Sequence, residues 1–148
     1  MSEGFAAASG RKVVSRASAE ELGKLTHFVV DVERRQVVSL VVGKGRKAQL
    51  VDWTNVSGFG PDAVIVADET SLYSPRDDGE QAAAAGKLDL VGKRALSDVG
   101  NELGTVTDIA FDPESGALET VLLKDLEEPA TALLGAGSFA AIIRAPAP

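Results

Sequence analysis

Few side chains in this sequence are suited to catalysis. The 148 residues include a single histidine, His27, and no cysteine. This composition excludes disulfides, thiol nucleophiles, cysteine-containing zinc sites and any site with two imidazole ligands from one chain. His27 could serve as a general base or a proton relay, but no Gly-x-Ser-x-Gly nucleophile motif accompanies it. We therefore expect a solvated histidine on a strand, and a protein that is not an enzyme.

Two further patterns could bind a cation or a nucleotide. Asp112, Glu114 and Glu119 surround one turn, but the turn lacks the ligand spacing of an EF-hand. Three segments, 43–48, 58–63 and 135–140, read Gly-x-Gly-x-x-Ala. A dinucleotide site needs such a loop to open a helix, whereas strand-like residues follow all three. We expect an acidic hairpin tip and glycine turns, with no metal and no cofactor; a weak Ca²⁺ or Mg²⁺ site is the alternative at the acidic turn.

The residues best suited to bind a protein are basic and aromatic. Lys44, Arg46 and Lys47 form the densest basic cluster, and Trp53 and Phe59 follow it. Tryptophan is enriched at binding hot spots, and a basic tip attracts acidic partners. These five residues are our candidate protein-contact surface. The alternatives are a solvated tip and aromatic side chains that fill the core.

The elements that carry these residues are repeated along the chain. Residues 21–31 align with residues 102–112 at an offset of 81, and five of the eleven positions are identical. The match extends upstream at an offset of 82 and resumes downstream at 77, where paired glycines coincide. Such self-similarity indicates tandem structural units. The predicted boundaries follow in order: a flexible N-terminus (1–9), repeat 1 (10–68), a linker (69–90), repeat 2 with a degenerate C-terminal part (91–145) and a tail (146–148).

Short strands are predicted inside each copy. Residues 25–31 and 37–42 are rich in branched and aromatic side chains, with a polar turn between them. No segment has a long apolar period of 3.6 residues, although the alanine run of the linker can add a turn or two of helix. The predicted fold is therefore all-β, with two tandem small antiparallel β-barrels. Copy two has the shorter connection after its second long strand, so we expect its last strand to be displaced or exchanged.

The repeat resembles the PRC-barrel family. The resemblance rests on segments 92–97 and 102–118 of copy two and on 22–31 and 50–66 of copy one, which keeps the family's Gly-x-Asp-Ala-Val-like ending. It implies an adaptor-type fold, similar to the cytoplasmic barrel of the reaction-centre H subunit and to the C-terminal domain of a ribosome maturation factor. No residue of either precedent carries over, and a shared fold is only an association with function.

Charge and composition narrow the function. The net charge is −7, all of it in residues 72–148, so the chain lacks the basic field of a nucleic-acid binder. We expect a cytoplasmic protein-interaction or scaffold module with a protein partner, self-association, no membrane contact and no direct nucleic-acid contact. Two alternatives remain: a regulatory protein that binds a small ligand or ion in the seam between the barrels, and a ribosome-linked or RNA-processing factor that binds a basic protein. Opposite charges at segments 44–47 and 124–128 could also join two copies of the chain.

Overall fold

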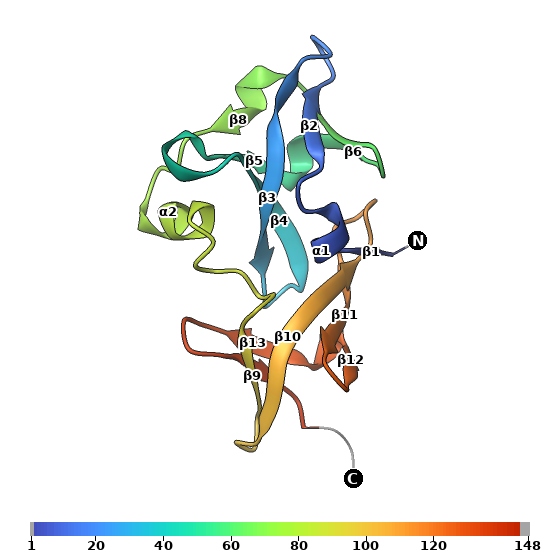
Figure 1. Ribbon diagram of the computed structural model, residues 1–148, viewed down its shortest axis with the longest axis vertical. Coiled ribbons are helices and arrows are strands. Elements are labelled where there is room, and N and C mark those ends of the chain that lie inside the picture. Colours follow the sequence, from blue (N-terminus) through green and yellow to red (C-terminus); the bar gives the residue numbers. More distant parts are fainter. Residues whose placement is uncertain (1, 146–148) are drawn as a thin grey trace.

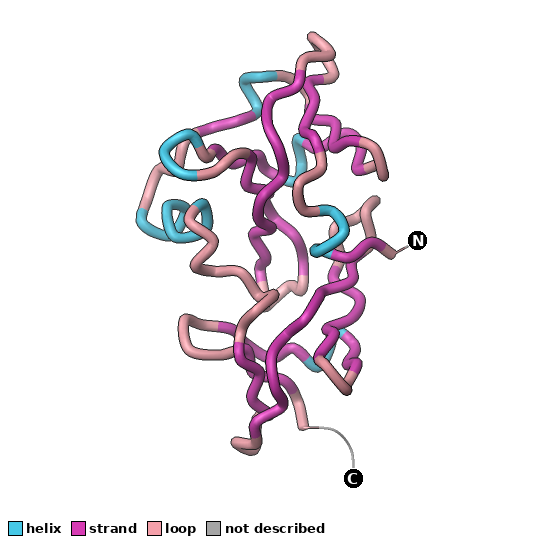
Figure 2. Tube along the Cα trace, in the orientation of Figure 1, coloured by secondary structure: helices cyan, strands magenta, loops and turns pink. Residues whose placement is uncertain are grey.

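The computed structural model describes residues 2–145, and the predicted tail 146–148 lies outside them. The protein is all-β, with one sheet for each repeat (Figures 1 and 2). The strands of the first sheet are β2 (Lys12–Ser15), β3 (Glu21–Asp31), β4 (Gln36–Val42), β5 (Gln49–Asp52), β6 (Val56–Phe59), β7 (Ala63–Val66) and β8 (Leu72–Tyr73). The strands of the second are β1 (Glu3–Gly4), β9 (Arg94–Ser97), β10 (Glu102–Phe111), β11 (Leu118–Leu123), β12 (Glu127–Pro129), β13 (Leu133–Ala136) and β14 (Ala141–Ile143).

The helices are short. They are α1 (Phe5–Ala8), α2 (Asp78–Ala84) and the 3₁₀ turns η1 (Gly45–Lys47), η2 (Trp53–Asn55), η3 (Glu69–Ser71) and η4 (Ala130–Ala132). Helix α2 forms in the predicted linker because local signals favour it. The Asp77 carboxylate accepts the Glu80 backbone N–H at 2.8 Å as an N-cap, and the alanine run follows.

The two sheets have the same topology. The first follows the order β6-β7-β2-β3-β4-β5, and the second follows β13-β14-β9-β10-β11-β12. The registers also agree: Leu25 pairs with Val42, and Val106 pairs with Leu123, both displaced by 81 residues. The bulges of the β3–β4 hairpin recur at matching positions of β10–β11. The repeat read from the sequence is therefore a structural repeat.

The sheets are antiparallel apart from one parallel pair in each: β2 pairs with β7, and β9 pairs with β14. One expectation about this topology is wrong. The last strands of copy two are neither displaced nor exchanged, because β13 and β14 occupy the places of β6 and β7. The missing residues shorten the connection between β11 and β12 instead, since connecting loops tolerate deletions better than strands.

The two repeats meet through their long hairpins. Gln36 forms an isolated antiparallel bridge with Ala117, its own repeat equivalent. On either side, the Val37 N–H donates to the Gly116 carbonyl and the Leu118 N–H donates to the Arg35 carbonyl, each at 2.9 Å. Val37 and Leu118 are repeat equivalents at the offset of 81, and so are Arg35 and Gly116, so each hydrogen bond is the counterpart of the other. The seam thus has a local pseudo-two-fold axis between the sheets.

One hydrophobic core continues across this seam. Phe111 of β10 is fully buried, and its ring centroid lies 5.2–5.3 Å from those of Phe5, Phe28 and Phe59. Trp53 packs beside Phe59 at 5.8 Å. A single unit of about 60 residues buries too little surface to be very stable, so sharing one aromatic cluster stabilises both units.

Strand β8 forms an edge of the first sheet and places Tyr73 beside Asp52, which changes the pKa of the tyrosine hydroxyl. The Tyr73 hydroxyl donates to Asp52 Oδ1 at 2.6 Å. Burial, reinforced by this hydrogen bond, raises the pKa of Tyr73 to about 12. Unfolded tyrosine has a pKa of about 10, so this contribution to stability is complete below pH ~10 and is lost as the pH rises toward 12.

Tyr73 is the only tyrosine, so tyrosinate absorbance measures it directly. We expect a midpoint near 12 in the native protein and near ~10 in denaturant. Tyr73→Phe should remove the corresponding fall in the free energy of unfolding over this pH range. A native midpoint equal to the denatured one would contradict the prediction.

Candidate functional site

The segments that lead into the two repeats cross between them. Strand β1 and helix α1 precede the first sheet, yet β1 pairs with β10 of the second sheet. The chain between α2 and β9 precedes the second sheet, yet it lies on β3 of the first. We call residues 3–9 and 86–91 the entry arms. Their exchange explains why residues 3–8 form ordered, partly buried structure where the sequence predicts a flexible terminus: the Phe5 side chain fills the shared core.

Each entry arm approaches its strand through a glycine. A β-carbon on Gly4 would lie 2.6 Å from Asp108 Oδ2, and one on Gly86 would lie 2.7 Å from His27 Cε1. Gly4 and Gly86 differ by the repeat offset of 82, and His27 and Asp108 by 81. The exchange is therefore reciprocal, and a side chain at either glycine would displace the residue that it meets.

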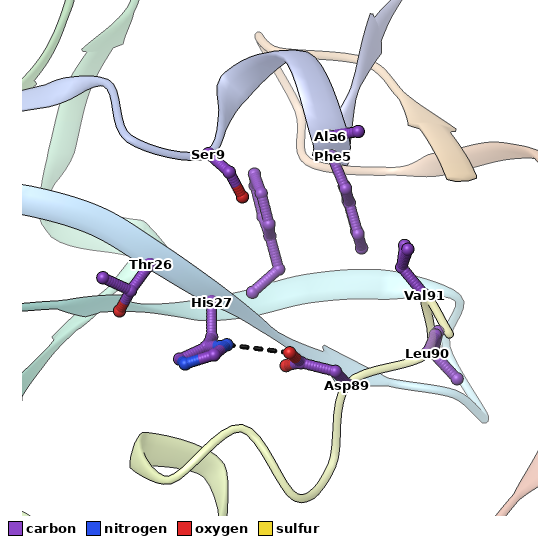
Figure 3. A pocket seen from close by; sticks show the side chains of 9 residues that line it. Phe5, Ala6, Ser9, Thr26, His27, Asp89, Leu90 and Val91 are labelled. Atoms are coloured by element: carbon purple, nitrogen blue, oxygen red, sulfur yellow. Dashed lines mark hydrogen bonds and ion pairs between the residues drawn. The ribbon is translucent and has the colours of Figure 1, made fainter. Parts of the chain in front are cut away.

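A cleft opens where both entry arms cover β3 (Figure 3). Its volume is about 150 Å³. The lining combines two phenylalanine rings, small and branched apolar side chains and a few polar groups. The residues are Phe5, Ala6, Ser9, Thr26, His27, Phe28, Asp89, Leu90 and Val91.

The polar centre of the cleft is a histidine–aspartate pair. His27 Nδ1 lies 2.8 Å from Asp89 Oδ2, as Figure 3 shows. The two side chains are 24% and 35% exposed. His27 lies on a strand, as predicted, but its side chain is only partly solvated. The entry arm covers the ring, and Asp89 fixes its orientation by accepting a hydrogen bond from it.

Sequence reasoning missed most of this cleft. Phe5 and Asp89 fall in segments assigned to a flexible terminus and to a linker. A usable signal was present: Gly4 and Gly86 match at the offset that relates Gly10 to Gly92, which extends the repeat upstream of both copies. The pairing of each entry arm with the opposite copy has no local signal, because such contacts join residues far apart in the chain.

The structure divides the five predicted contact residues between two places. Lys44, Arg46 and Lys47 are exposed at the η1 tip. Trp53 and Phe59 are half-buried in the aromatic cluster at the seam. The strand β5 separates the tip from η2, a span of about 13 Å for four residues. These residues therefore do not form one continuous surface.

The basic tip has an apolar neighbour that the sequence did not indicate. A hollow of about 490 Å³ lies between η1 and α2. Arg46 and Ala48 line one side of it, and Pro75, Ala84 and Ala85 line the other. Among residues 2–145, no carboxylate lies within ion-pair distance of any of the three basic side chains of the tip.

The acidic turn of copy two shapes its own backbone. Asp112 Oδ1 accepts the Glu114 backbone N–H at 2.8 Å, and this hydrogen bond lowers the pKa of the Asp112 carboxyl below its usual value. Across the described chain, no three acidic or histidine side chains gather as a cation site. The helices of residues 2–145 include none with the length and apolar character needed to cross a membrane.

The sequence of this chain was compared with curated proteins and with models of protein families. A search among curated proteins returned no significant match. The family model of the PRC-barrel domain matches residues 8–72, which span the first sheet almost entirely. The second sheet shares the strand order and hairpin register of the first but lies outside this match. The first repeat of the chain, residues 8–72, is therefore identified as a PRC-barrel domain.

Proposed function

We propose that the protein is a non-enzymatic interaction module whose basic hairpin tip binds an acidic segment of a partner protein. One observation carries the proposal: the tip holds three exposed cations that form no ion pair within residues 2–145, and one of them, Arg46, lines a largely apolar hollow. An acidic segment with small apolar side chains fits both features, because its carboxylates would meet the tip while its apolar groups contact the alanines of α2.

The charge distribution supports this orientation. The net charge of −7 lies entirely in residues 72–148, so this part of the chain repels an acidic partner. Complementary charge chiefly sets the rate and the geometry of association. A basic tip on an acidic protein therefore selects one docking position. Burial of the apolar hollow would add affinity that electrostatic attraction alone does not supply.

Charge reversal at the tip tests the proposal. In cross-linked pull-downs from native cells, we expect Lys44→Glu/Arg46→Glu/Lys47→Glu to reduce recovery of the partner at least ~10-fold, because attraction becomes repulsion. The matched control is Lys12→Glu/Arg16→Glu/Lys124→Glu, which changes the net charge equally at other exposed positions and should retain the partner. Binding of purified partner should also weaken as salt rises.

Other outcomes would contradict the proposal. A partner that remains on the tip variant uses a different surface, and a basic partner of that kind would favour the ribosome-linked alternative, with the acidic second repeat as its contact. Recovery of the protein alone, together with a dimer that dissociates in salt, would identify a second copy as the occupant of the tip.

A further inference from the structure

We propose that the cleft beneath the entry arms binds a small organic amine with a compact apolar body. This site goes beyond the proposed protein contact and does not depend on it. The argument rests on the size of the cleft, on its apolar walls and on the sign of its charge.

The volume of the cleft and its apolar lining favour a ligand whose body is a single ring or a short branched chain. The volume of about 150 Å³ equals that of an engineered protein cavity that holds benzene. Phe5 and Phe28 stack with their centroids 4.0 Å apart, and both are buried. Leu90 and Val91 of the other entry arm complete the apolar lining (Figure 3). Apolar surface of this kind favours a ligand body without polar atoms.

The negative charge of the lining favours a cationic ligand. Asp89 carries the only formal charge among the nine lining residues when His27 is neutral, and none of the nine is lysine or arginine. The His27 contact uses Asp89 Oδ2, which leaves the other carboxylate oxygen to accept a hydrogen bond from a ligand. The Thr26 hydroxyl donates to the Gly43 carbonyl at 2.7 Å, so only its oxygen lone pairs remain for a ligand. Apart from the Ser9 hydroxyl, which can donate or accept, these side chains offer acceptors to a group that donates.

The equivalent position in the second repeat holds a carboxylate whose hydrogen bonds are supplied by the protein itself, which gives a comparison for Asp89. Asp108 is the repeat equivalent of His27, and its Oδ1 accepts the backbone N–H groups of Ala6 at 3.0 Å and Ile109 at 2.8 Å. The backbone therefore satisfies Asp108. Asp89 instead faces the cleft, where one of its oxygens has no partner in the His27 contact.

Three probes that share one ring test the proposal: benzylamine, benzyl alcohol and benzoate. Affinities are measured on the full chain by chemical-shift perturbation in NMR spectra. We expect benzylamine to bind ~10-fold more tightly than benzyl alcohol, the ratio that corresponds to about 1.4 kcal/mol, and benzoate to bind most weakly. Resonances of the cleft residues should shift, and the tip variant described above should bind benzylamine like the wild type.

Variants separate the charge from the shape of the cleft. Asp89→Asn should weaken benzylamine ~10-fold and leave benzyl alcohol almost unchanged, while the exposed control Asp125→Asn should change neither. Val91→Trp should fill the cleft and abolish binding of all three probes. Equal or tighter binding of benzoate, an unchanged preference in Asp89→Asn, or no binding of any probe at millimolar concentration would overturn the proposal.

Discussion

Replacing Phe111 with alanine is expected to lower the free energy of unfolding by about 4 kcal/mol. The Phe111 ring of the second repeat is fully buried and contacts aromatic residues of the first repeat and of an entry arm. Its removal leaves a cavity among rings that belong to different segments, which cannot close together without moving the seam. The loss should therefore include both the hydrophobic transfer and the cavity.

Denaturant unfolding followed by two probes measures this effect. Trp53, the only tryptophan, is sensitive to the seam, and far-ultraviolet circular dichroism follows all strands. We expect coincident transitions in the wild type and a lower midpoint in Phe111→Ala. Phe139→Ala is the control, because that ring is 69% exposed, and it should change stability by less than ~0.5 kcal/mol. Separate transitions in the wild type would contradict a shared core.

Replacing Gly116 with alanine is expected to disrupt the contact between the two hairpins. Gly116 has a φ of +78°, which L-residues adopt at a cost of about 1–2 kcal/mol. Its added β-carbon would lie 2.5 Å from Gln36 Nε2 and 2.8 Å from Trp53 Cε2. Relief of these overlaps must move a ring of the aromatic cluster, so overpacking adds about 1–3 kcal/mol.

Gly100→Ala is the matched control for this prediction. Gly100 has a φ of +90°, and no heavy atom lies within 4 Å of its added β-carbon. This variant should therefore show the conformational cost alone, of about 1–2 kcal/mol. The difference in the free energy of unfolding between the two variants isolates the seam contact. Equal losses would show that the hairpins do not meet at Gly116, and Trp53 fluorescence should change in Gly116→Ala only.

Much of each sheet could be predicted from the sequence. The segments 25–31 and 37–42 lie within β3 and β4, because dense branched side chains favour strands and the polar turn between them favours a hairpin. Strand β6 was missed, since its central Gly58 resembles a turn residue. The basic residues of η1 are exposed as a hairpin tip requires, whereas Trp53 and Phe59 pack at the seam.

The sequence by itself determined the repeat, the all-β class and the family resemblance, because these depend on local side-chain pattern and on turn residues at fixed spacing. Only the tertiary structure decided that the entry arms exchange, that one aromatic core serves both sheets and that His27 meets Asp89 in a cleft. Those contacts join segments whose sequence separation is large, and short arms such as Glu3–Gly4 carry too few residues to specify a partner. The burial of Phe5 in the shared core, rather than any local preference, stabilises that choice.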